Sequence, residues 1–254
     1  MDLRLSGKTA LVTGASRGIG RSIVERLLAE GMHVAFSARS AQSVSAAEAA
    51  LGLGAAGSVV DSADLTAVAA WVDEVAAERG QVDVVVATTS AKGGIPATAD
   101  GWRTSFDIDV LGTVALIEAA LPHIKASGGG SIVQLGTTAS IEQHHFPGGG
   151  FSYGAMKAAL VNYISHLAKE IYADGIRANV VSPGPIYIDG GSWERIKTGM
   201  PDYYADHVAQ HPAGRFGRPE EVANVVAFLA SPMSSWVNAE NIVVDGGFTR
   251  RVSF

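Results

Sequence analysis

The chain has 254 residues, a net charge of −6 and an apolar fraction of 47%. This composition excludes a mainly disordered chain, and it argues against nucleic acid as the main partner because phosphate binding needs clustered positive charge. The lack of cysteine excludes disulfides, thiolate catalysis and cysteine-based zinc sites. We expect a soluble, cytoplasmic protein without a membrane segment, since the sequence shows neither a signal peptide nor a run of about 20 apolar residues.

Short β-branched segments alternate with helical patterns along the whole chain, as in βαβ units. The predicted strands are Thr9–Thr13, His33–Ser37, Gly57–Asp61, Val82–Val86, Ser131–Leu135, Arg177–Val181 and Asn241–Val244. Apolar residues at helical spacing predict helices that include Ile23, Leu65 and Met156, and Pro219 predicts a further helix start. The pattern predicts one α/β domain over residues 1–254, a Rossmann-type doubly wound parallel sheet of about seven strands with helices on both faces.

A glycine-rich loop joins the first predicted strand to the first predicted helix. Gly14 allows a tight turn, Gly18 allows the backbone to approach a pyrophosphate, and Gly20 allows the helix to pack on the strand. The helix start then offers free N–H groups to the negative charge. We therefore predict a dinucleotide site that includes Gly14, Ser16, Arg17, Gly18, Ile19 and Gly20.

Charge at the end of the second predicted strand indicates which dinucleotide binds. NAD-binding proteins normally place an acidic residue there, bonded to the ribose 2′-hydroxyl. This sequence has Arg39 instead, and Arg17 lies in the glycine loop. Arginine makes charge-assisted bonds to a 2′-phosphate. The sequence predicts NADP(H) in preference to NAD(H), with two solvated surface arginines as the alternative.

Tyr153 and Lys157 lie four residues apart at the start of a predicted helix and therefore share one helix face. An ammonium about 4 Å from a phenol, at an effective dielectric near 20, is worth roughly 4 kcal/mol. That energy corresponds to about three pKa units, so Lys157, helped by an oxidised nicotinamide ring, would bring the phenol pKa toward neutral pH. We predict a proton-transfer pair, with an incidental Tyr and Lys on an amphipathic helix as the alternative.

Four motifs occur in a fixed order along the chain. They are Thr13–Gly20, Tyr153–Lys157, Asn179–Gly184 and Val244–Gly247. Together they resemble the short-chain dehydrogenase/reductase family over essentially the whole chain. The layout is similar to that of the bacterial 3-oxoacyl-carrier-protein reductases.

The resemblance implies roles for individual residues. Tyr153 would be the general acid/base, and Lys157 would lower its pKa and bind the nicotinamide ribose. Asp61 and Ser62 would lie against the adenine. Further cofactor contacts would come from Pro183, Gly184 and Ile186 beside the nicotinamide, and from the backbone of Ala87 and Thr88. Helices around Thr104–Pro122 and Tyr153–Tyr172 would build a homotetramer, with a homodimer as the alternative.

The sequence departs from the family pattern at several positions. Ala87-Thr88-Thr89-Ser90 replaces the usual Asn-Asn-Ala-Gly after the fourth strand. Thr137 is the best match to the catalytic serine, and its hydroxyl would polarise a carbonyl; Thr138 and Ser140 remain alternatives. Asp109 replaces the asparagine that holds a proton-relay water, and its charge would change the local pKa balance. Ile188 replaces a threonine that often binds the carboxamide.

Residues 186–212 form the least regular predicted stretch and are interpreted as a mobile flap over the site, with a plain surface excursion as the alternative. Tyr187 and Trp193 would form an apolar wall against the substrate or would anchor the flap. His145, in the loop before Tyr153, would face either the substrate or solvent. No set of residues predicts a metal site.

We therefore expect an enzyme that transfers a hydride between NADP(H) and a small-molecule ketone or secondary alcohol. Thr137 and Tyr153 would hold the carbonyl oxygen, Tyr153 would donate the proton, and Lys157 with a water near Asp109 would reprotonate it. One alternative is an NADP(H)-binding scaffold or redox-sensing regulator without turnover, because fold alone does not establish activity. Another is an enzyme with a different proton relay centred on Asp109.

Overall fold

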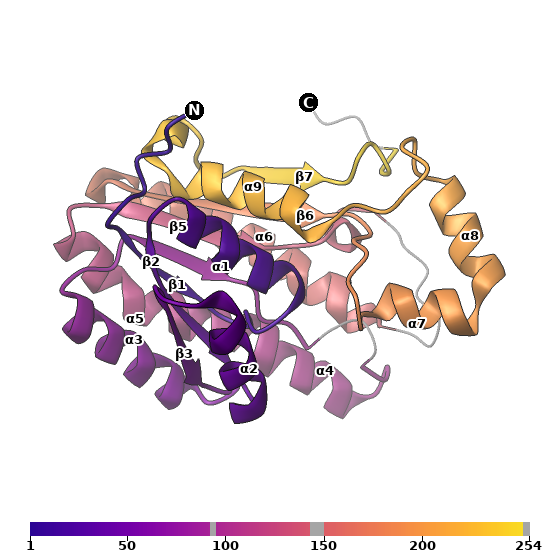
Figure 1. Ribbon diagram of the computed structural model, residues 1–254, viewed down its shortest axis with the longest axis horizontal. Coiled ribbons are helices and arrows are strands. Elements are labelled where there is room, and N and C mark those ends of the chain that lie inside the picture. Colours follow the sequence, from indigo (N-terminus) through magenta and orange to yellow (C-terminus); the bar gives the residue numbers. More distant parts are fainter. Residues whose placement is uncertain (92–94, 143–149, 251–254) are drawn as a thin grey trace.

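The computed structural model describes residues 1–91, 95–142 and 150–250. Its centre is a parallel sheet of seven strands in the order β3-β2-β1-β4-β5-β6-β7 (Figure 1). The strands are β1 (Thr9–Val12), β2 (His33–Ala38), β3 (Ala55–Val59), β4 (Val84–Ala87), β5 (Gly130–Leu135), β6 (Ile176–Pro183) and β7 (Asn241–Val244). The strand order reverses between β1 and β4, and ligands bind at this point in doubly wound sheets.

Two layers of helices cover the sheet (Figure 1). One core lies between the sheet and α1 (Gly18–Ala29), α2 (Ala41–Leu51) and α9 (Pro219–Ala230). The other core lies between the sheet and α3 (Leu65–Arg79), α5 (Gly112–Ala126) and α6 (Phe151–Ile171). Side chains alternate between the cores, with Val84 and Val86 in the first and Val85 in the second. The predicted Rossmann-type architecture is confirmed.

Shorter helical segments complete the described structure. They are α4 (Ala99–Ser105), the π-helical η1 (Phe106–Leu111), and the 3-10 turns η2 (Thr138–Ser140), η3 (Tyr172–Asp174) and η4 (Pro232–Ser234). Within the described ranges, no helix is long and apolar enough to cross a lipid bilayer. The same residues contain no group of three His, Asp or Glu side chains that could hold a metal ion.

The third strand begins and ends two residues earlier than predicted. It spans Ala55–Val59 rather than Gly57–Asp61, because pairing with β2 runs from Val34 opposite Ala55 to Ala38 opposite Val59. Asp61 and Ser62 therefore lie beyond the carboxyl end of the strand. They lead directly into α3, whose first turn is capped by the Asp64 side chain.

Residues 186–212 are more regular than predicted, and the interpretation of this segment as irregular is wrong. The segment folds into α7 (Ser192–Gly199) and α8 (Pro201–Ala209), which extend from one end of the molecule (Figure 1). A β-bridge between Ile186 and Gly217 closes its base. Proline at the first position of α8 is favourable for helix initiation, and aromatic side chains of both helices pack on Phe216. This aromatic packing orders a segment for which the sequence pattern predicted no regular structure.

A buried carboxylate joins the amino-terminal ends of β1 and β4. Asp83 accepts a hydrogen bond from the Thr9 backbone N–H at 2.8 Å and contacts the Lys8 ammonium at 2.9 Å. Asp83 in turn donates its backbone N–H to the Thr9 carbonyl. The side chain thus satisfies a buried donor at the start of the central strand.

We predict that Asp83→Ala lowers the free energy of unfolding by about 1–3 kcal/mol, because the buried Thr9 N–H loses its acceptor. Equilibrium urea denaturation measures the change. The matched control is Asp206→Ala in α8, whose exposed carboxylate has no such role. Equal stability of Asp83→Ala and the control would contradict the prediction.

Candidate active site

The glycine loop has the geometry that a dinucleotide requires. Gly14 and Gly18 adopt left-handed φ values of 64° and 59°, which favour glycine. A Cβ on Gly20 would lie 2.8 Å from the Gly14 carbonyl oxygen, so this position admits no side chain without displacing the loop. Among the described residues, no side chain caps the start of α1, and its first N–H groups are left for a ligand. These features fit a bound pyrophosphate.

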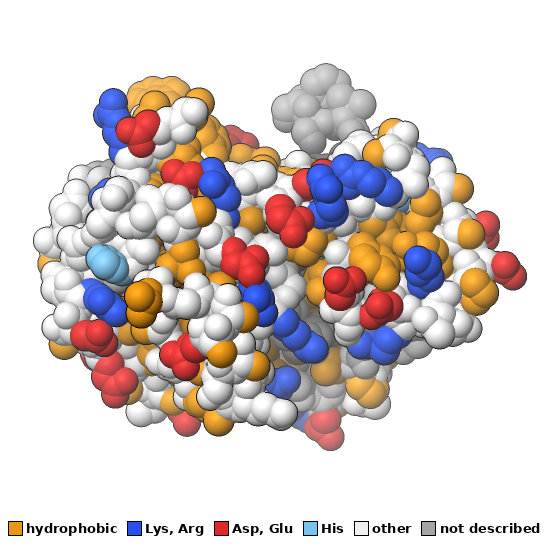
Figure 2. All heavy atoms as spheres, in the orientation of Figure 1, with side chains coloured by type: hydrophobic (Ala, Val, Ile, Leu, Met, Phe, Trp, Pro, Cys, Tyr) orange, Lys and Arg blue, Asp and Glu red, His pale blue; other side chains and the backbone are white. Residues whose placement is uncertain are grey.

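Two arginines flank this loop with their guanidinium groups uncommitted. Arg17 precedes α1, Arg39 follows β2, and both side chains are exposed. In the described part of the chain, neither guanidinium has a hydrogen-bond or ion-pair partner. Figure 2 shows basic side chains along the middle of this face, between the region of α2 and the region of α7. The charge and exposure of the two arginines fit a phosphate on the adenosine ribose.

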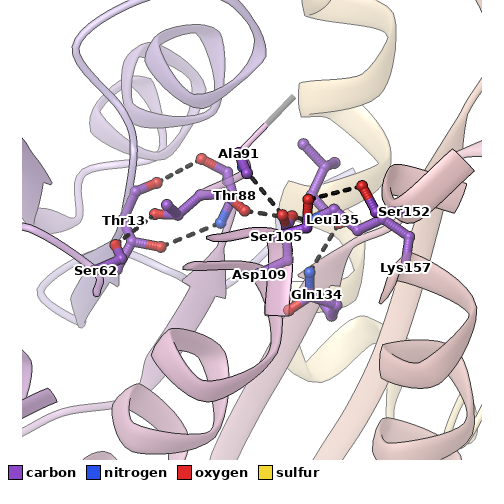
Figure 3. A network of polar contacts seen from close by, with 11 residues as sticks. Thr13, Ser62, Thr88, Ala91, Ser105, Asp109, Gln134, Leu135, Ser152 and Lys157 are labelled. Atoms are coloured by element: carbon purple, nitrogen blue, oxygen red, sulfur yellow. Dashed lines mark hydrogen bonds and ion pairs between the residues drawn. The ribbon is translucent and has the colours of Figure 1, made fainter. Parts of the chain in front are cut away.

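Threonines after β4 connect the ends of neighbouring strands (Figure 3). Thr88 donates its hydroxyl to the Thr13 carbonyl, and the Thr13 hydroxyl accepts from the Thr88 N–H at 3.2 Å. The buried Ser62 hydroxyl donates to the Thr89 hydroxyl at 3.1 Å. Ala87 is buried at the end of β4, while Asp61 is exposed beside Ser62. The segment that departs from the family pattern therefore still links the predicted adenine side to the glycine loop.

Thr137 is the hydroxyl that the structure brings to Tyr153. A side-chain hydrogen bond joins Thr137 to the Tyr153 phenol. Ser140 instead donates its hydroxyl to the Thr137 carbonyl at 2.7 Å, and Thr138 is buried in η2. Of the three candidate hydroxyls, Thr137 is the one with a described hydrogen bond to Tyr153, and its catalytic role stays a prediction.

Lys157 lies at the centre of a buried polar network (Figure 3). Its Nζ is 3.1 Å from Asp109 Oδ1, and the two side chains are 2% and 0% exposed. Nζ also donates to the Thr89 carbonyl at 3.1 Å. The second carboxylate oxygen of Asp109 accepts from the Ala91 N–H at 3.0 Å. The network joins α6, η1 and the segment after β4.

The phenol of Tyr153 is less acidic than the sequence predicted. Burial, opposed by the Thr137 hydrogen bond and reinforced by the Asp109 carboxylate, raises the pKa of Tyr153 to about 12. The prediction of a pKa lowered toward neutrality included a bound oxidised nicotinamide, and in the protein alone the pKa shifts in the opposite direction. The sequence could not show that the phenol is buried, and burial is the largest cause of this shift.

The turn after β6 packs closely against its surroundings. Pro183 ends the strand, and a Cβ on Gly184 would lie 2.7 Å from the Asp245 Cβ. Ile186 is buried. The Ile188 side chain packs against Gly18, where an added Cβ would lie 3.2 Å from Ile188 Cδ1. The turn therefore brings residues of the predicted nicotinamide border next to the glycine loop.

Aromatic rings of the predicted flap pack on one another. The ring centroid of Trp193 lies 4.4 Å from that of Phe216. Trp193 also stacks on Tyr203, with 6.5 Å between the ring centroids. Tyr187 contacts Tyr204 edge-on at 6.5 Å. This packing matches the anchoring alternative, and substrate contact by Tyr187 or Trp193 stays a prediction. His145 lies outside the described residues.

Sequence reasoning missed several residues of the network. Thr13 begins the glycine motif but was assigned no role, and Ala91 lies in no motif, although both bond to predicted site residues. Ser105 and Ser152 share a buried hydroxyl contact of 2.9 Å that joins the end of α4 to the start of α6. No signal in the sequence pairs two serines that are so far apart along the chain.

Comparison with known proteins identifies the family. The family described as enoyl-(acyl carrier protein) reductase matches residues 14–249. The chain is 35% identical to isoepoxydon dehydrogenase patN of Aspergillus clavatus, over 96% of this chain and 95% of that protein. It is 32% identical to the 3-oxoacyl-(acyl-carrier-protein) reductase FabG of Escherichia coli, over 96% of this chain and 98% of that protein. The crystal structure of gox2181 matches with a TM-score of 0.90 and 30% identity, covering 97% of each chain. The chain belongs to the short-chain dehydrogenase/reductase family, whose members are hydride-transferring oxidoreductases.

Proposed function

We propose that this protein is an NADP(H)-dependent oxidoreductase that interconverts a small-molecule ketone and its secondary alcohol. The observation that carries the proposal is the Thr137–Tyr153 hydrogen bond beside the buried Lys157. A hydroxyl donor, a protonated phenol and an ammonium close together are the groups that carbonyl reduction requires. The names of two relatives, a dehydrogenase and a 3-oxoacyl reductase, support the same chemistry.

In the proposed reaction, two hydroxyls bind the carbonyl oxygen and one of them donates the proton. A bound nicotinamide dinucleotide supplies the hydride for reduction or accepts it in the reverse direction. Thr137 and Tyr153 donate hydrogen bonds to the carbonyl oxygen and stabilise the negative charge that develops there. Tyr153 then transfers its proton to that oxygen as general acid.

Lys157 restores the proton that Tyr153 loses. Its ammonium has three donors, of which one goes to the Thr89 carbonyl, and Nζ also lies 3.1 Å from Asp109 Oδ1 as an ion pair. Another donor of the ammonium would bind the nicotinamide ribose. Asp109 lies next to Lys157 and would accept a hydrogen bond from the water that returns a proton from solvent.

The proposed cofactor site combines the glycine loop with both arginines. Gly14, Ser16, Gly18, Ile19 and Gly20 would hold the pyrophosphate. Arg17 and Arg39 would bind the 2′-phosphate, because their guanidinium groups are exposed and uncommitted in the described structure. The other contacts would come from Asp61, Ser62, Ala87, Thr88, Pro183, Gly184 and Ile186.

The assembly of the chain also belongs to the proposal. The homotetramer would form through the helices around 104–122 and 153–172. Phe106 and Phe151, at the starts of these regions, are 42% and 73% exposed, which supports coverage by a second copy. Residues 186–212 would cover the substrate within the same chain.

Tyr153→Phe tests the proton donor. We expect turnover to fall by about 10²–10⁴-fold, the usual contribution of a positioned general acid. Dinucleotide binding, measured by nicotinamide fluorescence, stays close to that of the unmodified protein. NADPH consumption with a panel of ketones, and the reverse reaction with secondary alcohols, provide the assay.

The control is Tyr163→Phe on the same helix, which should retain full activity. Unchanged turnover in Tyr153→Phe would overturn the proposed mechanism and favour a relay centred on Asp109. Dinucleotide binding by the unmodified protein, without turnover of any compound in the panel, would instead favour the non-catalytic scaffold.

Arg39→Ala tests the cofactor preference. Loss of a charge-assisted hydrogen bond to the 2′-phosphate costs about 1.5–3 kcal/mol, so the KM for NADPH should rise roughly 10–100-fold. The KM for NADH should not change, since NADH has no phosphate at this position. Arg79→Ala at the end of α3 is the control. An equal effect on both cofactors, or a preference of the unmodified protein for NADH, contradicts this assignment.

A further inference from the structure

A buried ion pair occupies the proposed site, and both of its partners are anchored. Lys157 comes from α6 and Asp109 from the π-helical η1, and neither side chain is appreciably exposed. The segment after β4 binds both partners, the ammonium through the Thr89 carbonyl and the carboxylate through the Ala91 N–H. Withdrawal of either partner would leave the other charge buried and unpaired, which is strongly unfavourable. The pair is therefore a fixed feature of the site (Figure 3).

The negative charge of Asp109 weakens the effect of the Lys157 ammonium on the ionisation of the Tyr153 phenol. The family resemblance leads us to expect a neutral asparagine at position 109, which would leave the ammonium charge unbalanced one helical turn from the phenol. A carboxylate 3.1 Å from Nζ cancels most of that charge as felt by the phenol. An opposite charge favours ionisation of a phenol, and its cancellation removes that effect.

We propose that Asp109 is a positioning residue that holds Lys157 in a neutralising pair and keeps Tyr153 protonated, so that the site favours carbonyl reduction over alcohol oxidation at neutral pH. This inference rests on the proposed role of Tyr153. In reduction, the carbonyl carbon gains a hydride, the C=O π bond breaks toward oxygen, and oxygen takes the Tyr153 proton. Oxidation runs the same steps backwards and needs the phenolate, which the pair makes scarce.

The other charged groups around α6 do not provide the missing positive charge. Asp100 and Arg103 of α4 pair with each other, and Arg177 of β6 is bonded to Ser234 and the Ser231 carbonyl. Asp174 pairs with Lys125 of α5, and Asp107, Glu118 and Glu142, further charged side chains on the described elements packed against α6 or next to them, are acidic. Burial and the Asp109 carboxylate both raise the pKa of Tyr153. Lys92, His144 and His145 lie outside the described residues.

The test is an absorbance titration of tyrosinate in the full-length protein without added dinucleotide. Subtraction of the Tyr153→Phe titration isolates Tyr153. In the unmodified protein, Tyr153 should form no tyrosinate below about pH 10, the range in which an ordinary tyrosine begins to ionise. In Asp109→Asn, the amide still accepts from Ala91 and the ammonium is unbalanced, so the midpoint should fall by about one to three pH units.

Two further variants separate the charge effect from a structural one. The double variant Asp109→Asn/Lys157→Gln has no ammonium and should lose the acid shift of the single variant. Asp107→Asn, on the same helical segment but exposed, should titrate like the unmodified protein. A folded Asp109→Asn with an unchanged midpoint, or a double variant that shifts as far as the single one, would overturn the inference.

Kinetics of the unmodified protein provide a measurement that does not depend on the folding of any variant. The kcat for alcohol oxidation should rise about tenfold per pH unit into the alkaline range, while kcat for reduction stays level between about pH 6 and 9. A plateau in oxidation near neutral pH would contradict the role of Asp109. Retention of turnover by Tyr153→Phe would instead contradict the proposed function. The tyrosinate titration would still measure how the Asp109–Lys157 pair affects the ionisation of Tyr153.

Discussion

The buried ammonium of Lys157 is the point on which the geometry of the site depends. It is held by a carboxylate from η1 and a carbonyl from the segment after β4, so one charged group joins three parts of the chain. Breaking a buried ion pair by removing one partner typically costs about 3–5 kcal/mol. The pair therefore fixes where α6 begins relative to the carboxyl edge of the sheet. The position of Tyr153, one helical turn earlier, follows from that placement.

The departures from the family pattern lie close together in space. Threonines replace the usual residues after β4, and they supply hydroxyl contacts to Thr13 and Ser62. The backbone of the same segment holds both members of the Asp109–Lys157 pair. A change in one of these positions alters the surroundings of the others. The substitutions thus form one connected network.

Helices α7 and α8 belong to one packed aromatic cluster. Their rings pack on Phe216, and His211 stacks on Phe248 near the carboxyl terminus at 4.3 Å. Ile188, at the base of the same segment, lies beside Gly18 of the glycine loop. A packed aromatic cluster gives this segment a defined shape, since aromatic rings bury a large area with few rotatable bonds.

The sequence by itself determined the features that depend on short-range patterns. Alternating apolar runs and helical spacing indicated the parallel sheet, and the spacing of Gly14, Gly18 and Gly20 indicated the loop after β1. Tyr153 and Lys157 share a helix face because they lie four residues apart. Each of these features is set by neighbours in the chain, and a single sequence contains that information.

Only the tertiary structure decided which groups from distant segments meet. It places the Thr137 hydroxyl, at the start of η2, in a hydrogen bond with Tyr153 of α6. It ordered residues 186–212 through contacts with Phe216, and it raised the pKa of Tyr153 by burying the phenol and, to a smaller extent, by placing the Asp109 carboxylate near it. Electrostatic and packing energies depend on distance in space, and separation along the chain does not predict that distance.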